Sequence, residues 1–175
     1  MYVISCDPGK TGGICIFKDG ELLTATPVPI HKDGHINVCE VEYMFDVMLD
    51  RYVKVFSVME NVHAMPTDGR SSIMSFGRTT GNLEAVLRLA THDHFHQVRP
   101  QDWKKHFGLK GKNKEQAIEL VESLQPDIWD ANEYNGYPEY FFMPRKKTIN
   151  KQEKSGIADA YLIGKYYLEN NSSTV

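Results

Sequence analysis

Cysteine is scarce in this chain, and its cysteines are not spaced for pairing or for binding a metal. The three are Cys6, Cys15 and Cys39, an odd number without a Cys-x-x-Cys spacing, which argues against a disulfide framework and a zinc ribbon. Long apolar runs are also missing, because none reaches the roughly 18 residues that a membrane span requires. Asp7 and Lys10 interrupt the N-terminus before a signal-peptide core can form. We therefore expect no membrane association and a cytoplasmic location.

The rest of the composition is that of an ordinary globular protein. Hydrophobic residues make up 41% of the chain and charged residues 25%, which excludes disordered, collagen-like and coiled-coil classes. The length of 175 residues suits one domain and leaves no room for a two-lobed ATPase. We predict a single domain over residues 1–175.

The net charge of −3 hides a strongly uneven distribution. Residues 99–114 carry a net charge of +5 and residues 145–154 a net charge of +4, which leaves −12 for the remainder. Positive charge gathered in two segments predicts a localised phosphate-binding face, although each segment taken alone is also consistent with a solvated loop. The lysines that we expect to contact phosphate are Lys104, Lys105, Lys110, Lys112, Lys114, Lys146 and Lys147.

Local patterns predict an α/β fold. Short apolar runs bounded by turn residues predict five strands, at residues 2–6, 14–17, 21–28, 54–62 and 95–98. Helical spacing of apolar residues predicts helices at residues 38–52, 71–90, 100–106, 114–124 and from about 155 onwards. Asn37 and Asn113 are suitable N-caps. A three-stranded meander followed by alternating helices and strands predicts a five-stranded mixed sheet with helices on both faces, an arrangement similar to that of ribonuclease H.

Three carboxylates stand where ordinary folding favours another residue. Asp7 ends an apolar strand before a glycine turn, Glu60 ends a strand expected near the centre of the sheet, and Asp159 interrupts an apolar helical stripe. A buried carboxylate without a partner is costly and indicates a metal, a cation or hydrogen-bond donors. The alternatives are a turn role for Asp7 and a capping or tyrosine contact for Asp159.

Oxygen ligands of this kind suit Mg²⁺, with Mn²⁺ as a substitute. Two such ions can generate a hydroxide and stabilise the leaving oxygen of an in-line phosphodiester displacement. Residues 9–11 are similar to the end of a P-loop, but Ile4 stands where that motif requires glycine, and we expect no nucleotide cofactor. The alternating His92, His94 and His96 are suited to an exposed strand face or, alternatively, a transition metal.

The order of these motifs resembles the RuvC family of Holliday junction resolvases, in particular its divergent, phage-type members. The resemblance is carried by residues 7–13 after the first strand, Glu60, the basic segment at 104–114 and Ala158-Asp159-Ala160. It spans nearly the whole chain and implies a location in a bacterial cell or a phage-infected host. It implies a homodimeric, Mg²⁺-dependent endonuclease that nicks opposed strands of a four-way junction, with Asp7, Glu60 and Asp159 as catalytic metal ligands.

The chain departs from the family at the fourth metal ligand. The family places Asp or His three or four residues before the last aspartate, where this chain has Gly156 and Ser155. Glu153, Lys154 or a water molecule is left to complete the site. Lys154 is alternatively a catalytic residue that neutralises developing charge on phosphate.

Family members also carry a residue that wedges into the junction after the strand that ends at the glutamate. Such a wedge is hydrophobic or aromatic, and apolar side chains separate stacked bases in this way in other DNA-binding proteins. The candidates in residues 63–77 are His63, Met65 and Phe76. Phe76 is alternatively a core residue. Arg70 and Arg78 are expected to contact phosphate, and the helix predicted at 71–90 to form the dimer face.

Two other functions remain open at this stage. The missing fourth ligand is consistent with a catalytically weak or silent module that binds junctions. The fold is also consistent with a ribonuclease-H-like nuclease acting on RNA–DNA hybrids.

Overall fold

The computed structural model describes residues 1–50, 52–63, 69–129 and 149–171. Its strands form one sheet in the order β3-β2-β1-β4-β5. The strands are β1 (Tyr2–Asp7), β2 (Gly13–Lys18), β3 (Glu21–Pro27), β4 (Val55–Glu60) and β5 (Phe95–Val98). The helices are α1 (Val38–Met48), α2 (Arg70–Ala90), α3 (Pro100–His106), α4 (Lys114–Leu124) and α5 (Lys151–Asn170). The predicted mixed five-stranded α/β fold is confirmed.

The sheet is mixed because its first three strands form a meander and the others are reached by crossovers. β1 pairs antiparallel with β2, and β2 with β3, while β4 runs parallel to both β1 and β5. Parallel neighbours place their carboxyl ends at the same edge of the sheet. β1 and β4 are such neighbours, so Asp7 and Glu60 come to lie at one edge.

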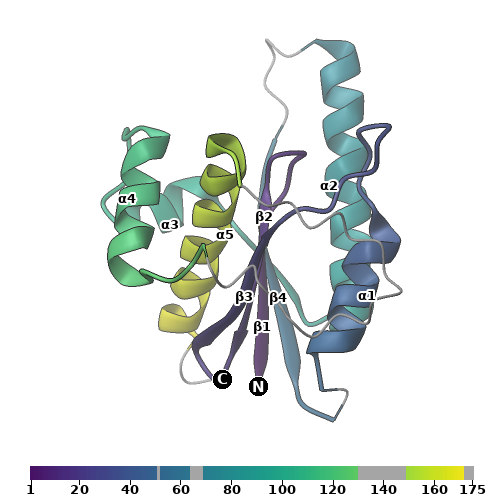
Figure 1. Ribbon diagram of the computed structural model, residues 1–175, viewed down its shortest axis with the longest axis horizontal. Helices are drawn as coiled ribbons and strands as arrows, with labels where there is room; N and C mark the ends of the chain where they lie inside the picture. The colour runs from purple at the N-terminus through teal and green to yellow at the C-terminus, as the bar shows by residue number, and fades with distance from the viewer. Residues whose placement is uncertain (51, 64–68, 130–148, 172–175) are drawn as a thin grey trace.

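Helices cover both faces of the sheet, as Figure 1 shows: α1 and α2 lie on one side, and α3, α4 and α5 on the other. Alternating side chains of each strand serve two separate cores. Val3 and Val58 pack in the core beneath α5, whereas Ile4 and Met59 pack in the core beneath α1 and α2. None of the described helices has the length and apolar character needed to cross a bilayer.

Glycines bring α5 unusually close to the sheet. Gly156 forms a bridge with Gly12, in the turn between β1 and β2. A Cβ on Gly156 would lie 2.1 Å from the Thr11 carbonyl oxygen, and one on Gly13 would lie 2.5 Å from the Ile157 Cα. These distances leave no room for a side chain, so the glycines fix the position of the N-terminal half of α5 relative to β1.

Two helix boundaries differ by several residues from those predicted. α1 ends at Met48 instead of continuing to Tyr52, because the Asp50 side chain accepts a hydrogen bond from the Tyr52 amide and favours a turn. Tyr52 is 99% exposed. α5 begins at Lys151, before the predicted start at 155, because Asn150 and Glu153 form a reciprocal capping box.

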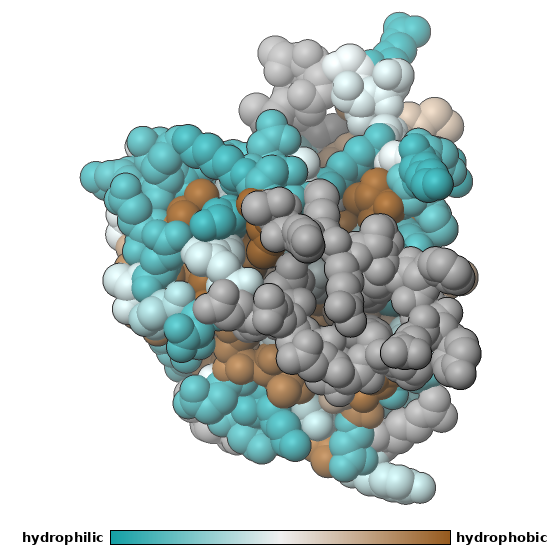
Figure 2. Space-filling view, viewed as in Figure 1, coloured by the Kyte–Doolittle hydropathy of each residue, from teal (hydrophilic) through white to brown (hydrophobic). Residues whose placement is uncertain are grey.

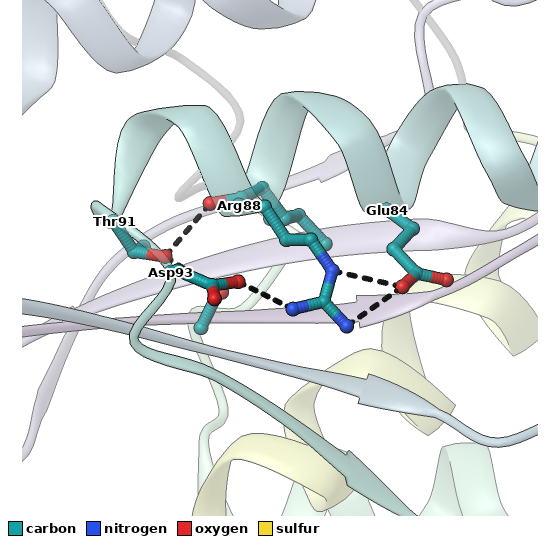
Figure 3. Close-up of polar contacts among 6 residues, drawn as sticks. Glu84, Arg88, Thr91 and Asp93 are labelled. Carbon is teal, nitrogen blue, oxygen red and sulfur yellow. Dashed lines mark hydrogen bonds and ion pairs between the residues drawn. The ribbon is translucent and has the colours of Figure 1, made fainter.

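The end of α2 is tied to the start of β5 by an ion-pair network, drawn in Figure 3. Arg88 donates to Glu84 at 2.9 Å and also pairs with Asp93. The Thr91 hydroxyl donates to the Leu87 carbonyl at 2.8 Å. This network fixes the turn that carries the chain into β5.

Candidate active site

Asp7 and Glu60 project from the same face of the sheet. Cys6 on β1 is paired in register with Met59 on β4, so the residues that follow them, Asp7 and Glu60, lie side by side. Since side chains alternate along a strand, Asp7 shares a face with Val3, and Glu60 shares a face with Val58. Both valines lie in the core beneath α5. The two carboxylates therefore point toward the layer of α3, α4 and α5.

Asp159 joins them from α5. The bridge between Gly12 and Gly156 places α5 beside the turn that follows Asp7, and Asp159 lies almost one helical turn beyond Gly156. Asp7 and Asp159 are partly buried, and Glu60 is 8% exposed. We call Asp7, Glu60 and Asp159 the carboxylate cluster.

The members of the carboxylate cluster act on one another electrostatically. Burial, followed by the charges of Asp159 and Glu60, raises the pKa of Asp7 well above its ordinary value of 3.8. Burial also raises the pKa of Asp159 to about 6, and Glu60 contributes to that increase. Like charges raise one another's pKa in this way only when they lie close together. The sequence prediction that these three side chains approach one another is therefore supported by their interaction.

Two lysines partly offset this negative charge. Lys104 on α3 and Lys114 at the start of α4 lower the pKa of both Asp7 and Asp159, against the larger opposing effect of burial. Both belong to the basic segment at 99–114 that we predicted to contact phosphate. Their positive charge near the carboxylate cluster is compatible with an anionic ligand at this edge of the sheet.

Trp103 is the member of the site that sequence reasoning missed. It lies on α3, is fully buried, and its indole Nε1 donates to the Glu60 Oε1 at 2.9 Å. Burial raises the pKa of Glu60, and this hydrogen bond lowers it in part. A tryptophan inside a basic segment was the available signal, but its partner lies 43 positions away in the chain.

The chemistry of these residues fits a divalent cation, although they do not form a ready-made cage. Carboxylate oxygens gathered against mutual repulsion are suitable ligands for Mg²⁺ or Mn²⁺. Ser155, one turn before Asp159, has a buried hydroxyl that finds no hydrogen-bond partner within the described part of the chain. In the same residues, no three His, Cys, Asp or Glu side chains are grouped closely enough to hold an ion as they stand.

Of the two positions at which the resemblance predicts a fourth ligand, Ser155 and Gly156, the second is closed by packing. Gly156 lies against the backbone of Thr11 and Gly12, so no side chain fits there. Glu153, which we had considered as a replacement, is used elsewhere: its Oε2 accepts from the Asn150 amide at 2.9 Å in the capping box of α5. One oxygen of this carboxylate thus caps the helix, and a role of Glu153 as a fourth ligand stays a prediction.

Lys154 is directed toward α4. Its Nζ lies 3.8 Å from the Glu122 Oε1 and 4.4 Å from the centre of the Trp129 ring. The lysines that influence the pKa of the carboxylate cluster are Lys104 and Lys114 instead. A catalytic role for Lys154 stays a prediction, and its contacts place it in the packing between α4 and α5.

The basic segment at 99–114 forms a surface around the site. Lys105, Lys110, Lys112 and Lys114 are exposed, and Lys104 is partly buried with its Nζ 4.9 Å from the Trp103 ring centre. Figure 2 shows a largely hydrophilic surface over α4, at the left of the view. Lys146 and Lys147 of the second basic segment lie outside the described residues.

The residues after β4 that we expected to wedge into a junction or to contact phosphate lie partly before α2 and partly on it. His63 is exposed beyond the end of β4, and Met65 lies outside the described residues. Arg70 begins α2 and is exposed, whereas Phe76 in the second turn is partly buried. Arg78 is exposed, with its Nη1 3.3 Å from the His35 Nε2.

The main apolar stripe of α2, which we expected to form the dimer face, is covered by the protein itself. This stripe of Leu83, Val86 and Leu87 packs in the protein's own core beneath α1 and α2. Other apolar side chains of the helix remain on the surface: Met74 is 79% exposed and Leu89 is 77% exposed.

A scan against protein-family models and a search of curated protein sequences found no match. Among solved structures, the chain is similar to RuvC of Thermus thermophilus in complex with a Holliday junction substrate. The TM-score is 0.55 at 14% sequence identity, covering 98% of both chains. Another structure of Thermus thermophilus RuvC gives a TM-score of 0.49 at 16% identity, covering 98% of this chain and 97% of that one. The first likeness shows that the fold is RuvC-like.

Proposed function

We propose that this protein is a structure-selective endonuclease that resolves Holliday junctions and acts on related branched DNA. The observation that carries this proposal is the carboxylate cluster at the carboxyl ends of β1 and β4, flanked by Lys104 and Lys114. The RuvC-like fold supports the proposal. The RuvC structure that matches with a TM-score of 0.55 is a complex with a Holliday junction substrate.

In this proposal, Asp7, Glu60 and Asp159 hold divalent cations, Mg²⁺ or Mn²⁺, with two ions in the complete site. When bound, such ions supply an activated water and stabilise the leaving oxygen of a phosphodiester displacement. The lysines of the segment at 99–114 bind the phosphates of the branched DNA and orient the scissile bond. The buried position of Glu60 limits the access of bulk water to the cluster.

The direct test is cleavage of a synthetic four-way junction in Mg²⁺ by the wild-type protein and by Glu60→Gln. The glutamine keeps an oxygen that can accept from Trp103 but removes the charge, so we expect cleavage to fall by at least about a thousandfold with junction binding retained. Glu42→Gln is the matched control, because Glu42 is an exposed carboxylate on α1, on the opposite face of the sheet. Cleavage by Glu60→Gln at the wild-type rate would refute the proposal.

A second candidate function is that of a catalytically silent module that binds junctions. It is favoured by Gly156, which closes the position of a fourth ligand, and by the lack of a ready-made metal cage within the described residues. Junction binding without any nick in either Mg²⁺ or Mn²⁺ would favour this function. Digestion of an RNA–DNA hybrid in place of the junction would favour a ribonuclease H activity.

We also propose that the protein acts as a homodimer inside the cell. Two opposed cuts in one junction require two active sites related by symmetry. Ile73, Met74 and Leu89 of α2 are apolar and exposed, and they offer surface for a second copy. Measuring the mass in solution, with Met74→Glu as the disrupting variant, tests this assembly.

A further inference from the structure

Trp103 occupies an unusual position for a residue in a basic surface segment. It lies on the short helix α3, directly before the partly buried Lys104 and the exposed Lys105, yet its own side chain is fully buried. The indole N–H points to the Glu60 Oε1 at a distance of 2.9 Å. A buried indole N–H requires an acceptor, and here the acceptor is a carboxylate of the proposed metal site.

This hydrogen bond has a defined effect on the carboxylate. The indole has a single N–H and no acceptor, so it engages one oxygen of Glu60 and leaves the other to a different partner. A neutral donor fixes the orientation of a carboxylate without compensating its charge, as a lysine or arginine would. The ionised carboxylate therefore retains its attraction for a cation while its rotation is restricted.

We propose that Trp103 is a positioning residue, whose indole N–H holds the Glu60 carboxylate in the orientation that receives a divalent cation. The proposal rests on the metal-binding function proposed above. Through this hydrogen bond the same side chain joins α3 to the site, and Lys104 lies over its ring at 4.9 Å. Trp103 thereby connects the phosphate-binding surface to the carboxylate cluster.

The chain contains a natural control for this arrangement. Its other tryptophan, Trp129, also donates an indole hydrogen bond to a glutamate, Glu122, at 2.8 Å, and also carries a lysine over its ring. Glu122 lies on α4 and is not a member of the carboxylate cluster. Replacing either tryptophan with phenylalanine removes the same kind of hydrogen bond, but only Trp103→Phe removes it from the proposed site.

The experiment measures Mn²⁺ binding to the full chain without DNA, by electron paramagnetic resonance of the free ion. We expect Trp103→Phe to bind Mn²⁺ at least about tenfold more weakly than the wild type, as loss of an outer partner of a ligand does elsewhere. Trp129→Phe should bind as the wild type does. Thermal unfolding of both variants shows whether a loss of affinity reflects a loss of folding.

A second readout does not depend on the folding of Trp103→Phe. In Trp129→Phe, Trp103 is the single tryptophan, so its fluorescence reports on its own surroundings. Paramagnetic Mn²⁺ bound to Glu60 should quench this emission in a saturable manner, and excess Mg²⁺ should restore it. Emission that stays unchanged while Mn²⁺ binds would overturn the proposal.

The outcomes separate this inference from the nuclease proposal. If the wild type binds Mn²⁺ and cleaves junctions, and folded Trp103→Phe binds Mn²⁺ equally well, the positioning role is wrong and the nuclease assignment stands. If Trp103→Phe loses Mn²⁺ affinity but the wild type cleaves no junction, the positioning role stands and the nuclease assignment is wrong. A wild-type protein that binds no Mn²⁺ overturns both.

Discussion

At the scale of single residues, we expect the carboxylate cluster to lower the stability of the protein when no cation is bound. Three acids share a partly buried site in which burial and mutual repulsion oppose ionisation. Such a site is costly without a cation. A bound cation would remove this cost and stabilise the fold in proportion to its affinity.

The stability of the metal-free protein should therefore depend on pH through Asp159. Its pKa of about 6 in the folded chain exceeds the ordinary 3.8, so the folded state binds more protons between these values and the free energy of unfolding falls as pH rises through them. Asp159→Asn removes this loss. We expect the variant to be more stable than the wild type by about 1–3 kcal/mol at neutral pH, measured by urea unfolding in a chelator. Equal or lower stability of Asp159→Asn would contradict the account.

The three carboxylates could be found from the sequence, whereas Trp103 could not. An acid at the end of an apolar strand or within an apolar helical stripe conflicts with its neighbours in the sequence, and that conflict is visible without a structure. The partner of Trp103 is set by the packing of α3 against the end of β4, and no local pattern records it. The direction of the Lys154 side chain could not be predicted either. Lys154 is close to Asp159 in the sequence, but its side chain contacts α4.

At the scale of elements, the contact between α5 and the sheet determines where Asp159 lies. Gly156 approaches the backbone of Thr11 and Gly12 so closely that a Cβ would overlap them. Backbone atoms cannot move aside as a flexible side chain can. The glycine at the family's fourth-ligand position is therefore required by this packing, and an added carboxylate would displace the helix.

Gly156→Ala tests this contact. We expect it to lower the free energy of unfolding by about 1–3 kcal/mol and to reduce junction cleavage by shifting Asp159. Gly81→Ala is the matched control, because Gly81 is also helical but has open space around its Cβ position, and it should be neutral or stabilising by up to about 1 kcal/mol. Chemical unfolding of both variants is the measurement. Equal stability of the two variants would show that α5 does not depend on this approach.

The helices and strands themselves were predictable because their apolar periods and caps are local. The predicted helix boundaries are wrong where hydrogen bonds of a side chain start or end the helix at a different residue than the apolar periodicity suggests. Asp50 ends α1 ahead of Tyr52, and the capping box of Asn150 and Glu153 starts α5 earlier than its apolar stripe suggests. The stripe of α2 was recognised, but periodicity does not reveal whether the protein's own core or a second copy covers it.

At the scale of the whole molecule, positive charge is concentrated near the edge of the sheet where the carboxylate cluster lies. The basic segment at 99–114 lies at the carboxyl ends of β1 and β4, within a chain whose net charge is −3. Binding of a polyanion at such a surface releases counterions, so it weakens steeply with salt.

The salt dependence of junction binding tests which surface contacts DNA. We expect Lys110→Ala with Lys112→Ala to reduce the slope of log affinity against log salt by about 1–2, because each lost phosphate contact removes about 0.9. Lys18→Ala with Lys54→Ala makes the same change in charge at the opposite end of the sheet, and its slope should equal that of the wild type. A larger effect of the control pair would place the DNA on another surface.

The central claim is that Asp7, Glu60 and Asp159 together hold divalent cations. The most direct measurement is the anomalous scattering of Mn²⁺ in crystals soaked in that ion. The account predicts peaks bound by carboxylate oxygens of all three residues, with the Trp103 indole still donating to Glu60. Saturating Mn²⁺ that leaves this cluster without a peak would contradict it.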